Sequence, residues 1–167
     1  MKVFLEEQKM TKPLVIIILA IVFIGFCISI VSKWESISQN NSGAKIAASS
    51  SLIILLLVAL IFLNLKLKTR IDEKGIYFQF YPVHFSYRFI AWNEISKCFI
   101  RKYKAIIEYG GWGFRIGLRK KIGSAFSVQG NIGLQIELKN GKKILIGTQK
   151  KEDMQRVIDN YSTKITN

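Results

Sequence analysis

Hydrophobic and polar positions divide this chain of 167 residues into two contrasting parts. Between Lys12 and Lys33 no residue is charged, and most of the interval is aliphatic or phenylalanine. A second charge-free interval runs from Ile46 to Leu65. At a rise of about 1.5 Å per residue, each interval is long enough to cross a hydrocarbon layer of roughly 30 Å. The pattern therefore predicts two transmembrane helices.

The two predicted helices divide the chain into five segments. In chain order these are a cytoplasmic N-terminus at 1–12, a transmembrane helix at 13–32, an external loop at 33–45, a transmembrane helix at 46–65 and a cytoplasmic domain at 66–167. Lys and Arg are more frequent before the first helix and after the second helix than in the loop between them. The positive-inside rule therefore predicts an inner-membrane protein with both termini cytoplasmic. A cleaved signal peptide is the alternative for the first helix, but its apolar run exceeds the usual length of about 7 to 15 residues.

From Lys66 onward the period of the pattern changes to two, which is typical of half-buried strands. Ile76, Phe78 and Phe80 alternate with polar or aromatic residues, and 132–138 alternates in the same way. Asn140-Gly141 separates that run from the next and predicts a hairpin. With further strands expected at 85–92 and 95–103, the domain should contain about seven short strands.

The last element has a helical period. In the segment KKEDMQRVIDNY the apolar residues Met154, Val157, Ile158 and Tyr161 recur at intervals of three and four. This spacing predicts an amphipathic C-terminal helix that packs one face on a sheet. Thr148 is its expected N-cap.

The stretch EYGGWGFRIGLRKK, residues 108–121, is rich in glycine and cations. A dinucleotide-binding fingerprint is excluded because Ile116 occupies the third glycine position, and the alternation that follows is that of a strand. Gly110, Gly111 and Gly113 are expected to form a turn or bulge. Trp112 is expected to enter the core beside Phe114.

Several segments together resemble the bacterial pleckstrin-homology-like domains. The segments are LKTRIDEKGIYFQFYP, FIAWNEI, EYGGWGFR, GNIGLQIELKNGKKILIGTQ and KKEDMQRVIDNY, which cover roughly residues 66–162. The resemblance is strongest to small membrane proteins with two transmembrane helices ahead of such a domain. It implies a bent seven-stranded β-barrel closed at one end by the C-terminal helix, and it does not supply an active site.

The resemblance does not extend to phosphoinositide recognition. Relatives that bind phosphoinositides use cations in and around the first hairpin of the domain. Here Lys68 and Arg70 are followed by Asp72 and Glu73, which argues against specific recognition of an inositol phosphate.

Residues suited to catalysis or metal binding are scarce. His84 is the single histidine and is expected in a surface loop, and one histidine with two cysteines makes no metal set. Cys27 lies in the first predicted helix and Cys98 in a predicted strand, so a disulfide between them is implausible. We expect no catalytic residue, no metal and no cofactor.

Positive charge is the strongest remaining signal. Residues 66–167 carry 20 of the 25 Lys and Arg residues and 8 of the 11 Asp and Glu residues. Such charges are either simply solvated or attracted to the anionic lipids of a cytoplasmic leaflet. The candidate contacts to lipid headgroups are Lys66, Lys68, Arg70, Arg101, Lys102, Lys104, Arg115, Arg119, Lys120 and Lys121. Nucleic acid is disfavoured as the polyanion because the domain lacks the exposed aromatic pattern of RNA-binding sheets.

These observations predict a membrane-anchored, non-catalytic binding or scaffolding module. The alternative is a regulatory or sensory subunit of a membrane complex, which binds a protein partner through the domain and the transmembrane helices. The two functions require different surfaces, a cationic one for lipid and an apolar groove or free strand edge for protein.

Overall fold

A computed structural model describes residues 3–10, 13–33, 42–116 and 123–166. The chain forms two compact units. The first, which we call the β unit, combines Met1–Lys9 with Leu65–Asn167, and the second, the helical unit, is the intervening segment Met10–Asn64.

The helical unit consists of α1 (Pro13–Ser32) and α3 (Ser42–Leu63). In the described residues, the stretch Lys45–Leu63 is long and apolar enough to cross a membrane, and Ile16–Ser32 is apolar but shorter. The large apolar side chains of these stretches are mostly exposed. The external loop predicted at 33–45 lies largely outside the described residues.

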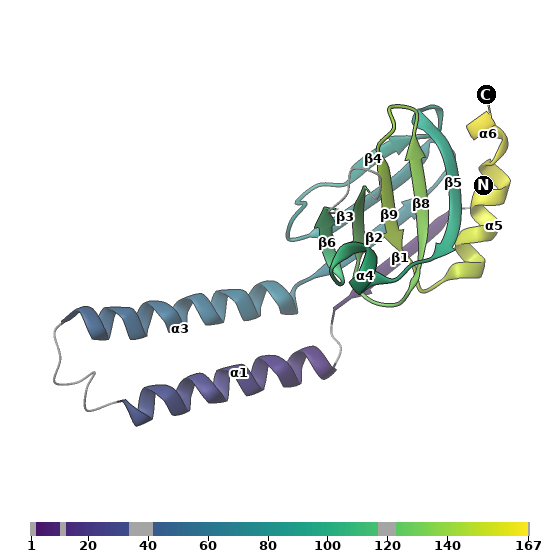
Figure 1. Cartoon of the computed structure of the whole chain (residues 1–167). Coiled ribbons are helices and arrows are strands. Elements are labelled where there is room, and N and C mark those ends of the chain that lie inside the picture. The colour runs from purple at the N-terminus through teal and green to yellow at the C-terminus, as the bar shows by residue number, and fades with distance from the viewer. Residues whose placement is uncertain (1–2, 11–12, 34–41, 117–122, 167) are drawn as a thin grey trace. The chain divides into compact units, whose positions relative to one another are not determined.

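The β unit contains two sheets (Figure 1). The first has the antiparallel order β1 (Phe4–Lys9), β2 (Lys66–Ile71), β3 (Gly75–Tyr81) and β4 (Arg88–Ala91). The second has the order β5 (Ile95–Lys102), β8 (Ile132–Leu138), β9 (Lys143–Gly147), β7 (Ser124–Ser127) and β6 (Gly113–Ile116). Only the β7–β9 pair is parallel among the described strand pairs of this sheet.

Short helices connect or cover the sheets. The 3₁₀ helix η1 (Trp92–Glu94) joins β4 to β5, and α4 (Ala105–Tyr109) follows β5. The chain closes with α5 (Lys151–Tyr161) and α6 (Thr163–Thr166). Figure 1 shows α5 running alongside β5, and α5 also contacts β1. Because β1 and β5 are edge strands, this helix packs against one edge strand of each sheet.

The core of the β unit lies between the sheets. Alternation in β3 buries Ile76, Phe78 and Phe80, as the sequence predicts. Phe78 meets Phe126 of the second sheet with ring centroids 4.9 Å apart. The apolar face of α5 is also buried, which confirms the predicted amphipathic helix.

The expected fold class, a transmembrane helical hairpin followed by a bent seven-stranded barrel, is wrong. The chain does not begin with such a hairpin, because β1 precedes both helices and pairs with β2 from Phe4↔Ile71 to Lys9↔Lys66. The described strands form sheets of four and five strands that do not close into a barrel. The 3₁₀ turn at η1 separates β4 from β5, so the ladder does not continue from one sheet to the other.

Polar side chains hold β1 in place. The inward residues of this strand are Phe4, Glu6 and Gln8, so two of its three buried positions are polar. The Glu6 carboxylate accepts hydrogen bonds from the Thr148 hydroxyl at 2.7 Å and from the Gln149 backbone N–H at 2.9 Å. The Gln8 side-chain amide donates to the Gly147 carbonyl at 2.8 Å. Burial of these polar groups is tolerated because each has a partner.

The remaining local expectations meet mixed outcomes. The hairpin at Asn140-Gly141 is confirmed by the antiparallel pairing of β8 with β9. The strand expected at 85–92 is shorter and begins at Arg88. Thr148 is not the N-cap of the C-terminal helix, because Lys150 occupies that position and the Thr148 hydroxyl donates to Glu6 instead.

Candidate functional site

One end of the β unit carries both connections to the helical unit. Lys9 ends β1, Lys66 begins β2, and the two are cross-strand partners. Lys66 also pairs with Tyr81, the last residue of β3. We call this end of the β unit, defined by Lys9, Lys66 and Tyr81, the connection end.

The short helix α4 lies at the same end (Figure 1). Gln8 of β1 donates to the carbonyl of Gly147, which pairs with Gly133. The side chain of Tyr103 reaches both glycines, with its ring near Gly133 and its hydroxyl near Gly147, and α4 begins two residues after Tyr103. This continuous set of contacts places α4 near the C-terminal end of β1.

The sequence of α4 fixes which face is buried. Ala105 and Tyr109, four positions apart, point inward and pack with Tyr103, Ala125 and Leu145. Because the helix has one inward face, Ile106 and Ile107 are left outside, with exposed fractions of 67% and 78%.

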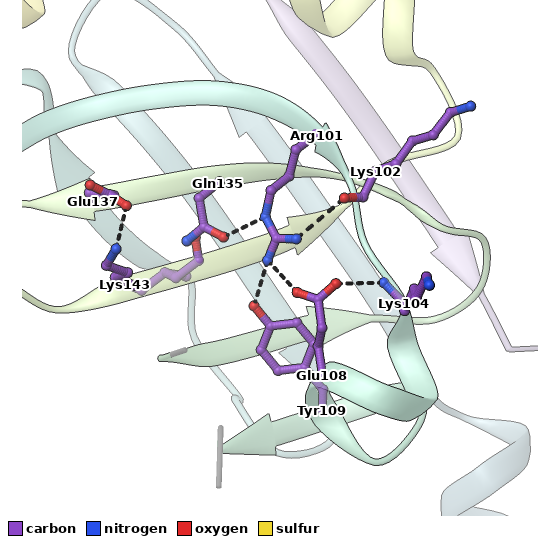
Figure 2. A network of polar contacts seen from close by, with 9 residues as sticks. Arg101, Lys102, Lys104, Glu108, Tyr109, Gln135, Glu137 and Lys143 are labelled. Atoms are coloured by element: carbon purple, nitrogen blue, oxygen red, sulfur yellow. Dashed lines mark hydrogen bonds and ion pairs between the residues drawn. The ribbon is translucent and has the colours of Figure 1, made fainter. Parts of the chain in front are cut away.

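A polar network fastens α4 to the second sheet (Figure 2). Arg101 of β5 lies 2.8 Å from the Glu108 carboxylate and donates to the Tyr109 hydroxyl at 3.2 Å. Its Nε donates to the Gln135 side-chain oxygen at 3.0 Å. The second oxygen of Glu108 accepts from the backbone N–H of Lys104 at 2.7 Å, which satisfies a free donor at the start of the helix.

The pKa values in this network reflect competition between burial and pairing. Burial alone would raise the pKa of Glu108, but hydrogen bonds from Arg101 and from the Lys104 backbone outweigh it and lower that pKa. Burial likewise opposes the charge of Arg101, yet the bond to Glu108 raises the pKa of the guanidinium. Burial is the main cause of the raised pKa of Tyr109. The network therefore holds a charged pair at neutral pH.

The predicted lipid-contact residues fall into separate groups. Lys66, Lys68 and Arg70 share the outer face of β2, where Lys68 lies 3.7 Å from Glu7 and Arg70 lies 3.0 Å from Asp72. Arg101 is engaged in the α4 network. Lys102 and Lys104 are exposed at the connection end.

The other predicted contacts lie around β6. Arg115 is exposed on that strand. Arg119, Lys120 and Lys121 lie outside the described residues. Of the cations predicted as one set, the structure thus brings Lys66, Lys102 and Lys104 to the connection end.

The glycine-rich turn after α4 is confirmed, but the placement of its tryptophan is wrong. Gly110, Gly111 and Gly113 have φ values of 74°, 125° and 110°, which non-glycine residues rarely adopt. Trp112 is not in the core, because 40% of it is exposed and its indole N–H donates to the Gly130 carbonyl at 2.9 Å. Gly110 and Gly111 lie in the turn between α4 and β6, and Gly113 is the first residue of β6.

His84 is also placed differently from the prediction. It lies in a loop, but only 8% of it is exposed, and its ring packs 5.3 Å from Phe126 and 6.0 Å from Phe114. Burial, with a smaller contribution from the charge of Arg88, lowers its pKa. A neutral, buried imidazole among phenyl rings is a packing residue.

The described residues offer little for metal or thiol chemistry. No group of three or more His, Cys, Asp or Glu residues that could hold a metal ion occurs among them. Burial raises the pKa of Cys98 to about 12, which keeps it a thiol at neutral pH.

Sequence reasoning missed the exposed apolar residues of the connection end. Ile106 and Ile107 interrupt a cationic segment and carry no period that marks them as exposed. Phe85, which is 81% exposed, was expected in a strand. The one available signal was that the adjacent residues Ile106 and Ile107 do not fit the alternating pattern of a half-buried strand.

Comparison with known proteins gives no relative. No protein-family model, no curated protein and no solved structure matches this chain.

Proposed function

We propose that this chain is a membrane-anchored, non-catalytic binding module. In this proposal the helical unit lies in a lipid bilayer, and the β unit stays at the bilayer surface. The exposed apolar side chains of Lys45–Leu63 support it, because contiguous apolar surface of this extent requires a cover of lipid or protein.

The observation that carries the proposal is the chemistry of the connection end. Met10–Lys12 is the whole linker between β1 and α1, and even fully extended it lets Lys9 and Pro13 lie at most about 14 Å apart. A bilayer that holds the helical unit therefore has its surface close to Lys66, Lys102 and Lys104. Each cation near an anionic leaflet contributes about 1 kcal/mol of attraction.

The pairing of Lys9 with Lys66 means that both ends of the helical unit lie on the same side of a bilayer. Both ends of the helical unit join neighbouring strands, so whatever part of the helical unit enters a bilayer must return to the side from which it started. We propose that this side is the cytoplasmic face of the inner membrane, where the flanking Lys and Arg residues favour it.

The likeness to pleckstrin-homology-like domains is part of the same proposal. A run of mostly antiparallel strands followed by a C-terminal helix that packs on them is compatible with such a domain. The open pair of sheets, the parallel pairing of β7 with β9 and the strand β1 ahead of the helices are departures from the expected form.

The test compares cations at the two ends of the β unit. Lys66, Lys102 and Lys104 are changed together to Gln in the full-length protein, and Lys74, Lys139 and Lys142 form the matched control. The control residues lie at the opposite end, in the β2–β3 turn and in the hairpin whose Lys139 N–H donates to Glu94. All six changes remove charge without reversing it.

The measurement is the association of spin-labelled phosphatidylglycerol, relative to phosphatidylcholine, with the protein in vesicles. We expect the parent and the control variant to prefer the anionic lipid and the connection-end variant to lose that preference. A parent protein without any preference would overturn the lipid contact, and one that alkaline washing removes from vesicles would overturn the membrane anchor.

A second candidate function is that of a regulatory subunit that binds a protein. The observation in its favour is β6, which pairs only with β7 among the described strands and leaves its other edge available for strand addition. Crosslinking in native membranes, followed by mass spectrometry, would favour it if a single protein were captured on Gly113–Ile116.

A further inference from the structure

The helix α4 holds two large apolar residues in solvent with little freedom to hide them. Ile106 and Ile107 are exposed because Ala105 and Tyr109 occupy the inward face of a helix of five residues. A rotation that buried either isoleucine would pull Ala105 or Tyr109 out of the core.

Hydrogen bonds at both ends prevent such a rotation. At the start, the Lys104 N–H is bonded to Glu108, whose carboxylate is paired with Arg101. At the end, the N–H groups of Gly110 and Gly111 bond back to the carbonyls of Ile106 and Ala105, both at 2.9 Å. The left-handed conformation of Gly110 then ends the helix. The exposure of Ile106 and Ile107 is thus a fixed feature of the fold.

The charges around these residues indicate what covers them. Lys102 and Lys104 precede the isoleucines in sequence and are exposed. Trp112 borders the same shallow hollow as Ile106 and Ile107, and its indole N–H is satisfied by Gly130. An apolar tip with nearby cations and a tryptophan is the combination found where proteins rest in a bilayer interface.

We propose that Ile106 and Ile107 insert into the interfacial layer of the same bilayer that holds the helical unit. Lys102 and Lys104 would then contact the headgroups above them. This inference rests on the proposed membrane anchor. The position of α4 favours lipid over a protein partner, because α4 lies at the end of the β unit where both connections to the helical unit leave.

The first experiment measures depth in the membrane. In full-length protein with Cys27→Ala and Cys98→Ala, a nitroxide is attached at Ile107→Cys or, as the matched control, at Asn140→Cys in the exposed hairpin turn of the opposite end. Both proteins are reconstituted into vesicles of phosphatidylcholine and phosphatidylglycerol. Collisions with oxygen and with a water-soluble nickel chelate are compared.

We expect the ratio of oxygen to nickel collisions to be several-fold higher at position 107 than at 140. Equal ratios in protein that is incorporated into the vesicles would overturn the insertion of α4 and leave the membrane anchor standing. Failure of either protein to incorporate would overturn the anchor itself, so the two failures are distinguishable.

A second experiment needs no substitution. A phosphatidylcholine with a photoactivatable diazirine in its acyl chain is included in vesicles with the unchanged full-length protein. After illumination, mass spectrometry should find lipid on the peptide that contains Ile106 and Ile107 and none on Lys139–Lys143. Lipid on both peptides, or on neither, would contradict the inference.

Discussion

The Thr148 hydroxyl donates a buried hydrogen bond of 2.7 Å to the Glu6 carboxylate, across a separation of 142 positions in the sequence. The same hydroxyl accepts from the Lys150 N–H at 3.1 Å, just before α5 begins. One threonine therefore links the first strand of the β unit to the entry of its last long helix. This contact keeps β1 in the sheet although the helical unit separates β1 from β2 in the chain.

Thr148→Val should destabilise the β unit by about 1 to 3 kcal/mol, because it leaves a buried carboxylate short of a donor and the Lys150 N–H without its acceptor. Amide hydrogen exchange of full-length protein in detergent would show the loss as faster exchange in β1. Thr69→Val is the matched control, since Thr69 is buried and its hydroxyl has no hydrogen-bond partner among the described residues. The control should be neutral or stabilising, and a comparable loss in both variants would contradict the role of the Glu6 contact.

The two described tryptophans should respond very differently to truncation. Trp92 is 4% exposed, and its indole N–H donates to the Asp72 carbonyl at 2.9 Å, so Trp92→Ala should cost about 3 to 5 kcal/mol. Trp112→Ala should cost clearly less, about 1 to 2 kcal/mol, because 40% of Trp112 is exposed and its truncation removes less buried apolar surface. Thermal unfolding of full-length protein in detergent measures the loss of stability in both variants. Equal losses would indicate that Trp112 is a core residue.

The attachment of α4 should weaken in acid. The pKa of Glu108 lies below its ordinary value of 4.5, so the folded state favours the carboxylate. Its stabilising contribution is present above pH 4.5 and is lost as the pH falls below that value toward the folded pKa. Protection of the Gly110 and Gly111 amides, corrected for the intrinsic exchange rate at each pH, should decrease in that range.

Glu108→Gln should remove this pH dependence and lower the protection at neutral pH. Glu137→Gln is the control, because Glu137 pairs with Lys143 at 2.6 Å on a different part of the sheet. Should the parent and Glu108→Gln lose protection in parallel as the pH falls, the carboxylate of Glu108 is not the group that titrates.

Gly123 and Gly141 form a matched pair for substitution by alanine. Their φ values are 78° and 80°, so each alanine carries the strain of the left-handed region, about 1 to 2 kcal/mol. At Gly141 the new methyl group meets nothing within 4 Å, whereas at Gly123 it would lie 2.1 Å from the Lys143 carbonyl oxygen. Gly123→Ala should therefore be clearly the more destabilising in thermal unfolding, and equal effects would contradict the close approach of the chain at Gly123.

Strands with a continuous apolar side could be predicted from the sequence. The alternation at Ile76, Phe78 and Phe80 and the hairpin at Asn140-Gly141 are local signals, since each depends on neighbouring residues or on a two-residue turn. The strand β1 lacks such a signal, because Glu6 and Gln8 occupy its inward positions. Their burial becomes favourable only when Thr148, Gln149 and Gly147 supply the partners.

The candidate site shows the same division. The sequence predicts the cations and the glycine turn, because charge and positive φ are properties of single residues. It does not predict that Arg101 forms an ion pair with Glu108, that Trp112 lies outside the core, or that Ile106 and Ile107 are exposed together.

Hydrophobic periodicity specifies secondary-structure elements one at a time, so the apolar helices, the basic body of alternating strands and the amphipathic C-terminal helix could be predicted from the sequence. The pairing of β1 with β2, which the helical unit separates in the chain, the open sheets and the common end of Lys66, Lys104 and Ile107 became apparent in the folded chain. Pairing, closure and exposure depend on contacts between residues far apart in the chain, and such contacts leave no periodic pattern in the sequence.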